Sequence, residues 1–194
     1  MFKHETQVIK FLLQWYSVNA RNLPWRKKNN LNLPDPYFVF VSEYMLQQTT
    51  VNTVKNKFND FILKWPSLNK LAQTSEPNIL KFWSGLGYYS RARNLLKSAK
   101  IIKKNFKNKI PQTYDELIQL PGIGDYTAKA ILGIGYNKSV MPLDANIERI
   151  LVRLHAIDKP INKVKNKLKD LGKKFISDKY SSNLIQSFMD YGSE

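Results

Sequence analysis

Two glycines one residue apart stand at the centre of the segment Leu120-Pro121-Gly122-Ile123-Gly124-Asp125-Tyr126-Thr127-Ala128-Lys129-Ala130. Proline cannot continue a preceding helix, and the two glycines tolerate a tight turn because they lack a Cβ. Asp125 or Thr127 is suited to cap the helix that follows. The pattern therefore predicts two short helices joined by a hairpin whose backbone N–H groups face outward, an arrangement that can hold a phosphate.

We expect this helix-hairpin-helix to hold a DNA phosphate without reading the base sequence, with Gly122, Gly124 and Thr127 at the contact. The alternative is an ordinary corner between two helices, with a glycine at the end of the first. The run Pro-Gly-Ile-Gly followed by Thr-Ala favours the phosphate interpretation. The hairpin by itself indicates DNA binding and does not indicate an enzyme.

Apolar residues in the rest of the chain recur at helical spacing, and no segment alternates over the length of a strand. The clearest expected helices cover residues 6–16, 37–48, 51–65, 91–106, 126–134 and 144–154. The fold class predicted from these patterns is all-α, with about ten helices.

The composition limits the possible chemistry. The 194 residues include no cysteine and two histidines, so the chain can supply no thiolate, and we expect no protein metal site. No apolar run reaches the roughly 18 residues of a membrane span, and the N-terminus has no signal-peptide pattern. We therefore expect a cytoplasmic protein without a membrane partner, in which any catalysis uses carboxylates, amines, phenols or water.

The chain is strongly basic. Thirty-one Lys and Arg against fifteen Asp and Glu give a net charge of +16 and an isoelectric point near 9.9. Such an excess favours a polyanionic partner, most simply nucleic acid. The alternative is a compositional bias, because an AT-rich genome enriches lysine, asparagine and isoleucine without selection for binding.

Two acidic residues, Glu43 and Asp144, are candidates for catalytic carboxyl groups. Glu43 is the only acid in residues 37–59 and lies in an apolar segment. Burial there would raise its pKa and keep a proton available, as a general acid requires. The alternative is a surface glutamate on an amphipathic helix. Asp144 is placed to cap the helix that follows it, and such a cap can also fix a carboxylate at the mouth of a cleft.

A second glycine pair, Gly85 and Gly87, precedes two tyrosines. This segment could present an exposed Leu86 as a wedge into DNA, or Leu86 and the aromatic residues could belong to the core. Gln48 stands at an expected helix end, where its amide could contact a base edge or remain solvated.

These segments together resemble the helix-hairpin-helix DNA glycosylase superfamily, and within it the MutY-type adenine DNA glycosylases. The matching residues, in the family's order, are at 23–26, 41–49, 85–94, 120–128 and 143–149. Met-Leu-Gln-Gln-Thr at 45–49 and Gly-Leu-Gly-Tyr-Tyr at 85–89 are specific to the adenine branch.

The resemblance implies two α-helical lobes with DNA and an extruded base in the cleft between them. Residues 30–136 would form a six-helix barrel that contains the helix-hairpin-helix, and residues 1–29 and 137–194 would form the second lobe, a truncated iron–sulfur lobe. It also implies a monomeric, nucleoid-associated enzyme of base excision repair. Its reaction would be hydrolysis of the N-glycosidic bond of adenine mispaired with 8-oxoguanine or guanine in double-stranded DNA.

The resemblance also implies the catalytic roles. Glu43 would protonate N7 of the flipped adenine, and Asp144 would stabilise the oxocarbenium-like sugar, as in glycoside hydrolysis with two carboxylates. Tyr126 stands where bifunctional glycosylase-lyases carry a lysine that forms a Schiff base. A monofunctional glycosylase without strand cleavage is therefore expected.

By the same matching, Arg26 and Gln186 would contact the adenine. Gln48 and Tyr88 would enter the duplex beside the opposite base, with Leu86 near it.

The family normally continues into four cysteines that bind a 4Fe-4S cluster and into a domain that recognises 8-oxoguanine. We expect the cluster to be absent, because the chain has no cysteine, and we expect DNA affinity and mismatch preference to be weaker. Two alternatives stay open. One is a non-catalytic or degenerate helix-hairpin-helix DNA-binding fragment. The other is a thymine or oxidised-pyrimidine glycosylase of the same fold, which fits the hairpin but not the adenine-branch segments.

Overall fold

The computed structural model describes residues 3–26 and 33–194, and every regular element in them is a helix, which confirms the predicted fold class. The elements are α1 (Lys3–Asn19), α2 (Pro36–Leu46), α3 (Val51–Lys64), α4 (Leu68–Ala72), α5 (Glu76–Trp83), α6 (Ser90–Asn105), α7 (Tyr114–Ile118), α8 (Asp125–Ala130), the π-helix η1 (Ile131–Gly135), α9 (Ala145–Leu154), α10 (Ile161–Lys173) and α11 (Ser181–Tyr191).

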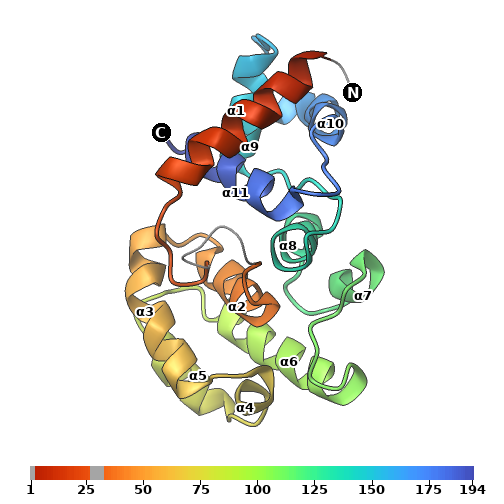
Figure 1. Ribbon diagram of the computed structural model, residues 1–194. Helices are drawn as coiled ribbons and strands as arrows, with labels where there is room; N and C mark the ends of the chain where they lie inside the picture. Colours follow the sequence, from red (N-terminus) through yellow and green to blue (C-terminus); the bar gives the residue numbers. More distant parts are fainter. Residues whose placement is uncertain (1–2, 27–32) are drawn as a thin grey trace.

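The helices form two lobes (Figure 1). Helices α2 to α7 make the lower lobe, while α1, α9, α10 and α11 make the upper lobe. The first and last helices pack together, and η1 contacts both α2 and α11, so that it joins the lobes. The two-lobe arrangement is therefore as predicted. The domain boundaries remain a prediction, and residue 30 lies outside the described residues.

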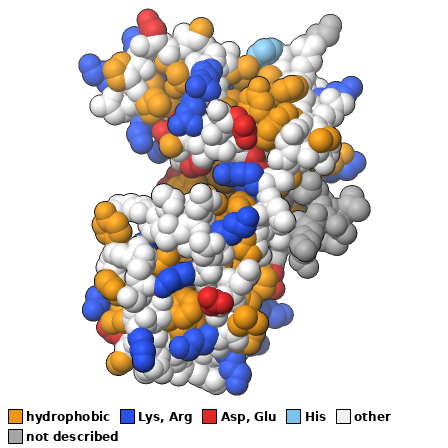
Figure 2. Space-filling model, turned by 90° about the vertical axis from the view of Figure 1, so that its left-hand side faces the viewer, with side chains coloured by type: hydrophobic (Ala, Val, Ile, Leu, Met, Phe, Trp, Pro, Cys, Tyr) orange, Lys and Arg blue, Asp and Glu red, His pale blue; other side chains and the backbone are white. Residues whose placement is uncertain are grey.

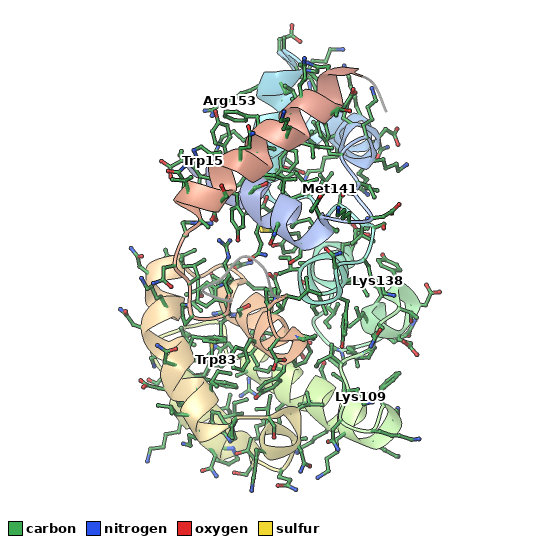
Figure 3. All side chains as sticks on the ribbon, viewed as in Figure 1. Trp15, Trp83, Lys109, Lys138, Met141 and Arg153 are labelled. Carbon is green, nitrogen blue, oxygen red and sulfur yellow. The ribbon has the colours of Figure 1, made fainter. Side chains whose placement is uncertain are left out.

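The buried apolar residues form one core that runs through both lobes. Helix α2 is the central helix of the lower lobe, and Phe40 and Tyr44 on it are fully buried, as is Trp83 below it (Figure 3). In the upper lobe, Phe175 and Phe188 meet edge to face with ring centroids 5.4 Å apart. The core is therefore continuous across the junction between the lobes, where polar side chains also lie.

Several helices begin at a polar side chain that accepts a hydrogen bond from the first turn. Asp35 caps α2, which has Pro36 at its first position, and Thr50 caps α3. Asp144 caps α9, as the sequence predicts. These caps satisfy N–H groups that would otherwise have no partner.

The segment expected as one helix over residues 126–134 is helical throughout, but the type of helix changes within it. The α-helix ends at Ala130, and the chain continues as the π-helix η1. Both glycines of η1 lie at close helix contacts: a Cβ on Gly133 would lie 2.2 Å from Ile185 Cδ1, and one on Gly135 would lie 3.2 Å from Pro36 Cα. The spacing of apolar residues could not predict the π-helix, because this wider turn occurs where η1 packs against α2 and α11.

No helix in residues 3–26 and 33–194 is long and apolar enough to span a membrane.

Candidate active site

A cleft of about 510 Å³ lies between the lobes and is lined by residues from both ends of the chain. Figure 2 shows the surface hollowed at this level, with acidic and basic side chains near the opening. Six of the residues singled out in the sequence line it: Arg26, Glu43, Gln48, Tyr126, Asp144 and Gln186. The fold therefore brings together side chains that are far apart in the sequence.

Glu43 lies on α2 with 7% of its surface exposed. Burial and, to a smaller extent, the nearby charge of Asp144 raise its pKa to about 8, although a hydrogen bond with Tyr126 and the charge of Arg26 act in the opposite direction. The alternative of a surface glutamate is therefore wrong. At neutral pH this carboxyl group holds a proton that it can donate into the cleft.

Asp144 combines the two roles considered for it. Its Oδ1 accepts a hydrogen bond from the Ile147 backbone N–H at 2.8 Å, and its Oδ2 accepts one from Asn146 Nδ2 at 3.1 Å. Burial raises the pKa of this carboxyl group, and the bonds from Ile147 and Asn146 oppose the rise. The helix cap thus fixes the orientation of a carboxylate that lines the cleft.

Tyr126 on α8 hydrogen-bonds with Glu43. Burial raises its pKa well above the ordinary value, and the charges of Glu43 and Asp144 add to the rise. The side chain is therefore a neutral phenol. It cannot form a Schiff base, which requires an amine.

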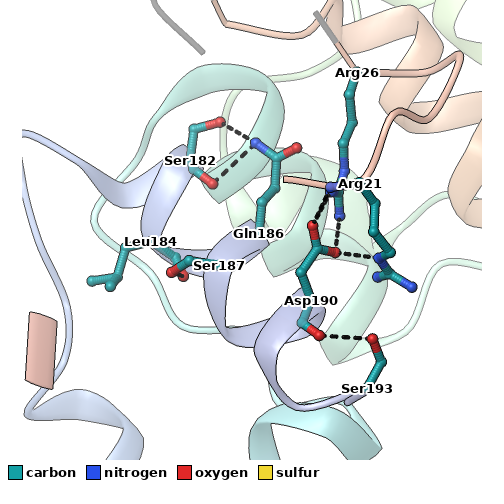
Figure 4. A network of polar contacts seen from close by, with 8 residues as sticks. All are labelled: Arg21, Arg26, Ser182, Leu184, Gln186, Ser187, Asp190 and Ser193. Atoms are coloured by element: carbon teal, nitrogen blue, oxygen red, sulfur yellow. Dashed lines mark hydrogen bonds and ion pairs between the residues drawn. The ribbon is translucent and has the colours of Figure 1, made fainter. Parts of the chain in front are cut away.

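Arg26 is held by an acid that the sequence analysis did not single out (Figure 4). Its guanidinium makes a two-pronged ion pair with Asp190, with Nη1–Oδ2 at 2.6 Å and Nη2–Oδ1 at 2.9 Å. Arg21 donates to the same carboxylate from its Nε at 2.6 Å and from its backbone N–H at 3.0 Å. Burial alone would raise the pKa of Asp190, but the two arginines outweigh it and the pKa is lowered.

The sequence does carry a signal for this site, because Asp190 is the only acid in α11. A lone acid on a fully buried helix face needs a cationic partner. The partner itself could not be identified, since Arg21 and Arg26 lie at the opposite end of the chain.

Gln186 lies one turn before Asp190 on α11 (Figure 4). Its Nε2 donates to the Ser182 carbonyl at 3.1 Å and to Ser182 Oγ at 3.2 Å. Its Oε1 is buried and has no hydrogen-bond partner within the described part of the chain. A buried acceptor without a partner is costly, and in a cleft it is a ready contact for a donor on a ligand.

Three other candidates lie around or outside the cleft. Gln48 is exposed and has a left-handed backbone, with φ of 55°. Tyr88 is also left-handed, with φ of 45°, and its side chain is 61% exposed, whereas Leu86 is only 5% exposed and lies in the core. An exposed Leu86 is therefore wrong for this structure: its backbone N–H bonds to the Trp83 carbonyl at 3.0 Å, and the side chain packs in the core.

The hairpin has the expected left-handed glycine, since Gly122 has φ of 82°. The expected side-chain cap is wrong: the N-cap residue of α8 is Gly124, which has no side chain, and the side chain of Thr127 is buried. For Thr127, therefore, only the backbone N–H group is suited to binding an anion. The hairpin is fixed to α2, because the Tyr44 hydroxyl donates to the Pro121 carbonyl at 2.5 Å.

Among residues 3–26 and 33–194, no group of three or more His, Cys, Asp or Glu side chains is placed to hold a metal ion. The full sequence has no cysteine, so the residues present do not fit a cluster with four thiolate ligands.

This geometry agrees with a family-level match. The family model for HhH-GPD superfamily base excision DNA repair proteins matches residues 41–174, which include Glu43, Tyr126, Asp144 and the hairpin. The chain belongs to the HhH-GPD superfamily.

Two similar curated proteins are both named adenine DNA glycosylase. An adenine DNA glycosylase of Buchnera aphidicola from Schizaphis graminum is 46% identical over 149 residues, covering 76% of this chain and 42% of that protein. The adenine DNA glycosylase of Homo sapiens is 36% identical over 201 residues, covering 99% of this chain and 37% of that protein. The chain thus spans about half the length, or less, of these curated relatives.

Solved structures of other DNA-repair proteins have a similar fold. A thermostable thymine-DNA glycosylase superposes with a TM-score of 0.83 at 22% identity, covering 98% of this chain and 87% of that chain. A trapped endonuclease III–DNA covalent intermediate gives 0.73 at 17% identity, covering 97% of this chain and 85% of that chain. At these identities the likeness concerns the fold alone.

Proposed function

We propose that this chain is a monofunctional adenine DNA glycosylase of base excision repair, acting on adenine opposite 8-oxoguanine or guanine. The observation that carries the proposal is the pair of carboxyl groups in one cleft, with the pKa of Glu43 raised to about 8. Similarity to relatives named adenine DNA glycosylase supports adenine as the base.

In the proposed reaction, the adenosine nucleotide leaves the duplex and enters the cleft, because its glycosidic bond is otherwise inaccessible. Protonated Glu43 donates its proton to N7 of adenine. The bond between C1′ and N9 then breaks, and its electron pair goes to the base. The Asp144 carboxylate faces the positive charge that develops on the sugar.

Water completes the reaction by adding to C1′, and its proton goes to a carboxylate of the site, leaving an abasic sugar and free adenine. The neutral phenol of Tyr126 orients Glu43 through their hydrogen bond. Because Tyr126 carries no amine, the reaction stops at the abasic site without cleaving the strand.

Two side chains support recognition of a purine that carries an amino group. The buried Oε1 of Gln186 can accept a hydrogen bond from the N6 amino group of adenine. Arg26 is fixed by Asp190 and places a cation at the same wall of the cleft. We therefore assign both residues to adenine binding.

The proposed partner is double-stranded DNA containing an adenine mismatch. The net charge of +16 favours DNA binding, and the hairpin around Gly122 and Gly124 offers backbone N–H groups to one phosphate. Gln48 and Tyr88 are exposed, which supports assigning them to entry into the duplex. We propose that the protein acts as a monomer in the cytoplasm, on nucleoid DNA.

The test is incubation of excess protein with a duplex containing adenine opposite 8-oxoguanine, followed by alkali to cleave at abasic sites. We expect cleavage only after alkali, and loss of cleavage in Glu43→Gln and Asp144→Asn. Asn is also a good helix cap, so the second variant removes the charge and keeps α9 intact. A duplex with thymine opposite guanine tests the pyrimidine alternative. DNA binding without any base release would identify a non-catalytic DNA-binding module instead.

A further inference from the structure

Arg91, in the first turn of α6, is a buried guanidinium that the proposed chemistry does not use. Its side chain lies in the lower lobe with the residue 5% exposed. The centroids of the Trp83 and Tyr88 rings are both 5.6 Å from its Cζ. Burying a cation is costly, so the structure must compensate its charge.

One side of this guanidinium caps the C-terminus of α2, the helix that carries Glu43. Nη1 donates to the carbonyls of Tyr44 at 3.3 Å and Met45 at 2.7 Å, and also to that of Gln47. The last carbonyls of a helix have no partner within the helix, and they attract a positive charge. Arg91 therefore fixes the point where α2 turns into residues 47–49.

The other side of the guanidinium holds the segment before α6. Nη2 donates to the carbonyls of Leu86 at 2.8 Å and Gly87 at 3.0 Å, and Nε donates to that of Tyr88 at 3.4 Å. Nη2 also donates to Thr49 Oγ1 at 2.9 Å, and this hydroxyl group donates to the Leu86 carbonyl at 3.3 Å. One side chain thus joins the 47–49 segment to the 86–88 segment.

Each joined segment carries one exposed residue in an unfavourable conformation. Gln48 has φ of 55° and Tyr88 has φ of 45°, a region that side chains with a Cβ rarely adopt. Such residues persist only where the surroundings hold them. Left-handed residues also occur elsewhere in the chain, at Lys107 for example, but Gln48 and Tyr88 have neighbours fixed by one shared guanidinium.

We propose that Arg91 is a positioning residue that holds Gln48 and Tyr88 in the paired, left-handed conformation that enters the duplex. This inference rests on the proposed function, because it assigns Arg91 to the extrusion of the base from the duplex. Arg91 does not touch the base or the reacting atoms. Its effect on the reaction passes through the two exposed residues.

The geometry requires arginine in particular. The planar guanidinium presents five N–H donors in a fixed fork, which can reach the carbonyls of both segments at once. A lysine keeps the charge but has three donors on one nitrogen atom. Arg91→Lys therefore separates the need for charge from the need for a bridge.

The test is a double-mutant cycle with a duplex containing adenine opposite 8-oxoguanine. The single-turnover rate of base release and the duplex dissociation constant are measured for Arg91→Lys in two backgrounds, the natural chain and Gln48→Ala/Tyr88→Ala. If Arg91 acts through these residues, the substitution lowers the rate by about tenfold in the natural chain and by less than about twofold in the double variant. Arg93→Gln removes an exposed guanidinium from the same helix, and it should change the rate by less than about twofold.

Equal losses in both backgrounds, or no loss in the natural chain, would overturn the inference while leaving the proposed function intact. A natural chain that releases no adenine would overturn both. If the melting temperature shows that Arg91→Lys is unfolded, Thr49→Val takes its place. This substitution removes one hydrogen-bond acceptor of Arg91. It should lower the rate of base release by less than Arg91→Lys does, and it should not lower the rate in the Gln48→Ala/Tyr88→Ala background.

Discussion

At the scale of single residues, the environment gives two carboxyl groups different roles. Glu43 accepts few compensating interactions, so burial dominates and the proton is retained. Asp144 accepts hydrogen bonds from Ile147 and Asn146, which favour its charged form against the effect of burial. The same separation into an acid and a carboxylate is required for cleavage of a glycosidic bond.

The raised pKa of Glu43 predicts both a rate profile and a stability profile. Its folded pKa is about 8 against an ordinary value of 4.5, so the folded state binds more protons than the unfolded state between these values. Stability contributed by the protonated group is full below about pH 4.5 and is lost as the pH rises to about 8. The loss is at most about 5 kcal/mol.

Glu43→Gln should therefore flatten the dependence of the unfolding free energy on pH between pH 5 and 8, as measured by urea denaturation. It should also lower the single-turnover rate of adenine release by about 10²- to 10⁴-fold, because the proton donor is lost. In the natural chain the rate should fall above about pH 8. A rate that kept rising through pH 9 would exclude Glu43 as the general acid.

At the scale of elements, α11 is fixed to the N-terminal segment by the ion pairs of Asp190 with Arg21 and Arg26. Removing one partner of a buried pair leaves an uncompensated charge.

The hairpin, in contrast, is held by a hydrogen bond and by backbone geometry. It is fixed to α2 by Tyr44, and its shape depends on one left-handed glycine, Gly122.

Asp190→Asn should lower the free energy of unfolding by about 3–5 kcal/mol, since Arg26 would remain buried with a weaker partner. The lowered pKa of Asp190 means that this contribution is present at neutral pH and is lost as the pH falls below the ordinary value of 3.8. Asp170→Asn is the matched control, because its pair with Lys173 is exposed to solvent and its loss should leave the free energy of unfolding almost unchanged. Equal effects of the two substitutions in urea denaturation would contradict the assignment.

The hairpin glycines differ in what they tolerate. Gly122 has φ of 82°, and a Cβ there would lie 3.0 Å from Asn94 and 3.1 Å from Tyr44, whereas a Cβ on Gly124 would have no neighbour within 4 Å. Gly122→Ala should therefore destabilise the fold by about 1–2 kcal/mol and weaken duplex binding, while Gly124→Ala should change stability by less than about 0.5 kcal/mol. Thermal unfolding and a gel shift measure the two effects. The hairpin geometry would be refuted if Gly122→Ala proved the milder substitution.

At the scale of the whole molecule, two lobes that share one apolar core flank a cleft lined by apolar and polar side chains, and the chain is strongly basic. A protein that neutralises several phosphates releases the counterions bound to them. The observed association constant should therefore fall with salt, with a slope of log K against log salt concentration of about −3 or steeper. Titrations of a duplex from low to high salt measure it. An affinity indifferent to salt would show that the charge does not act in DNA binding.

Local patterns predicted much of this structure because they act over a few residues. The turn at Gly122, the cap at Asp144 and the apolar faces of the helices follow from φ preferences, hydrogen-bond geometry and helical spacing. The buried state of Leu86 and the π-helix η1 did not follow, because each depends on packing against distant segments. The side chains of Asp125 and Thr127 do not cap α8, because its N-cap position is Gly124, which has no side chain.

The sequence by itself determined the all-α fold, the hairpin, the two acids and the absence of a thiolate ligand. Only the tertiary structure decided which residues share the cleft, that the pKa of Glu43 rises to about 8, that Asp190 holds Arg26, and that Arg91 joins the segments of Gln48 and Tyr88. The reason is physical. Helix propensity and turn geometry are local, whereas burial and ion pairing arise only when segments that are distant in the sequence, such as those of Arg26 and Asp190, come together.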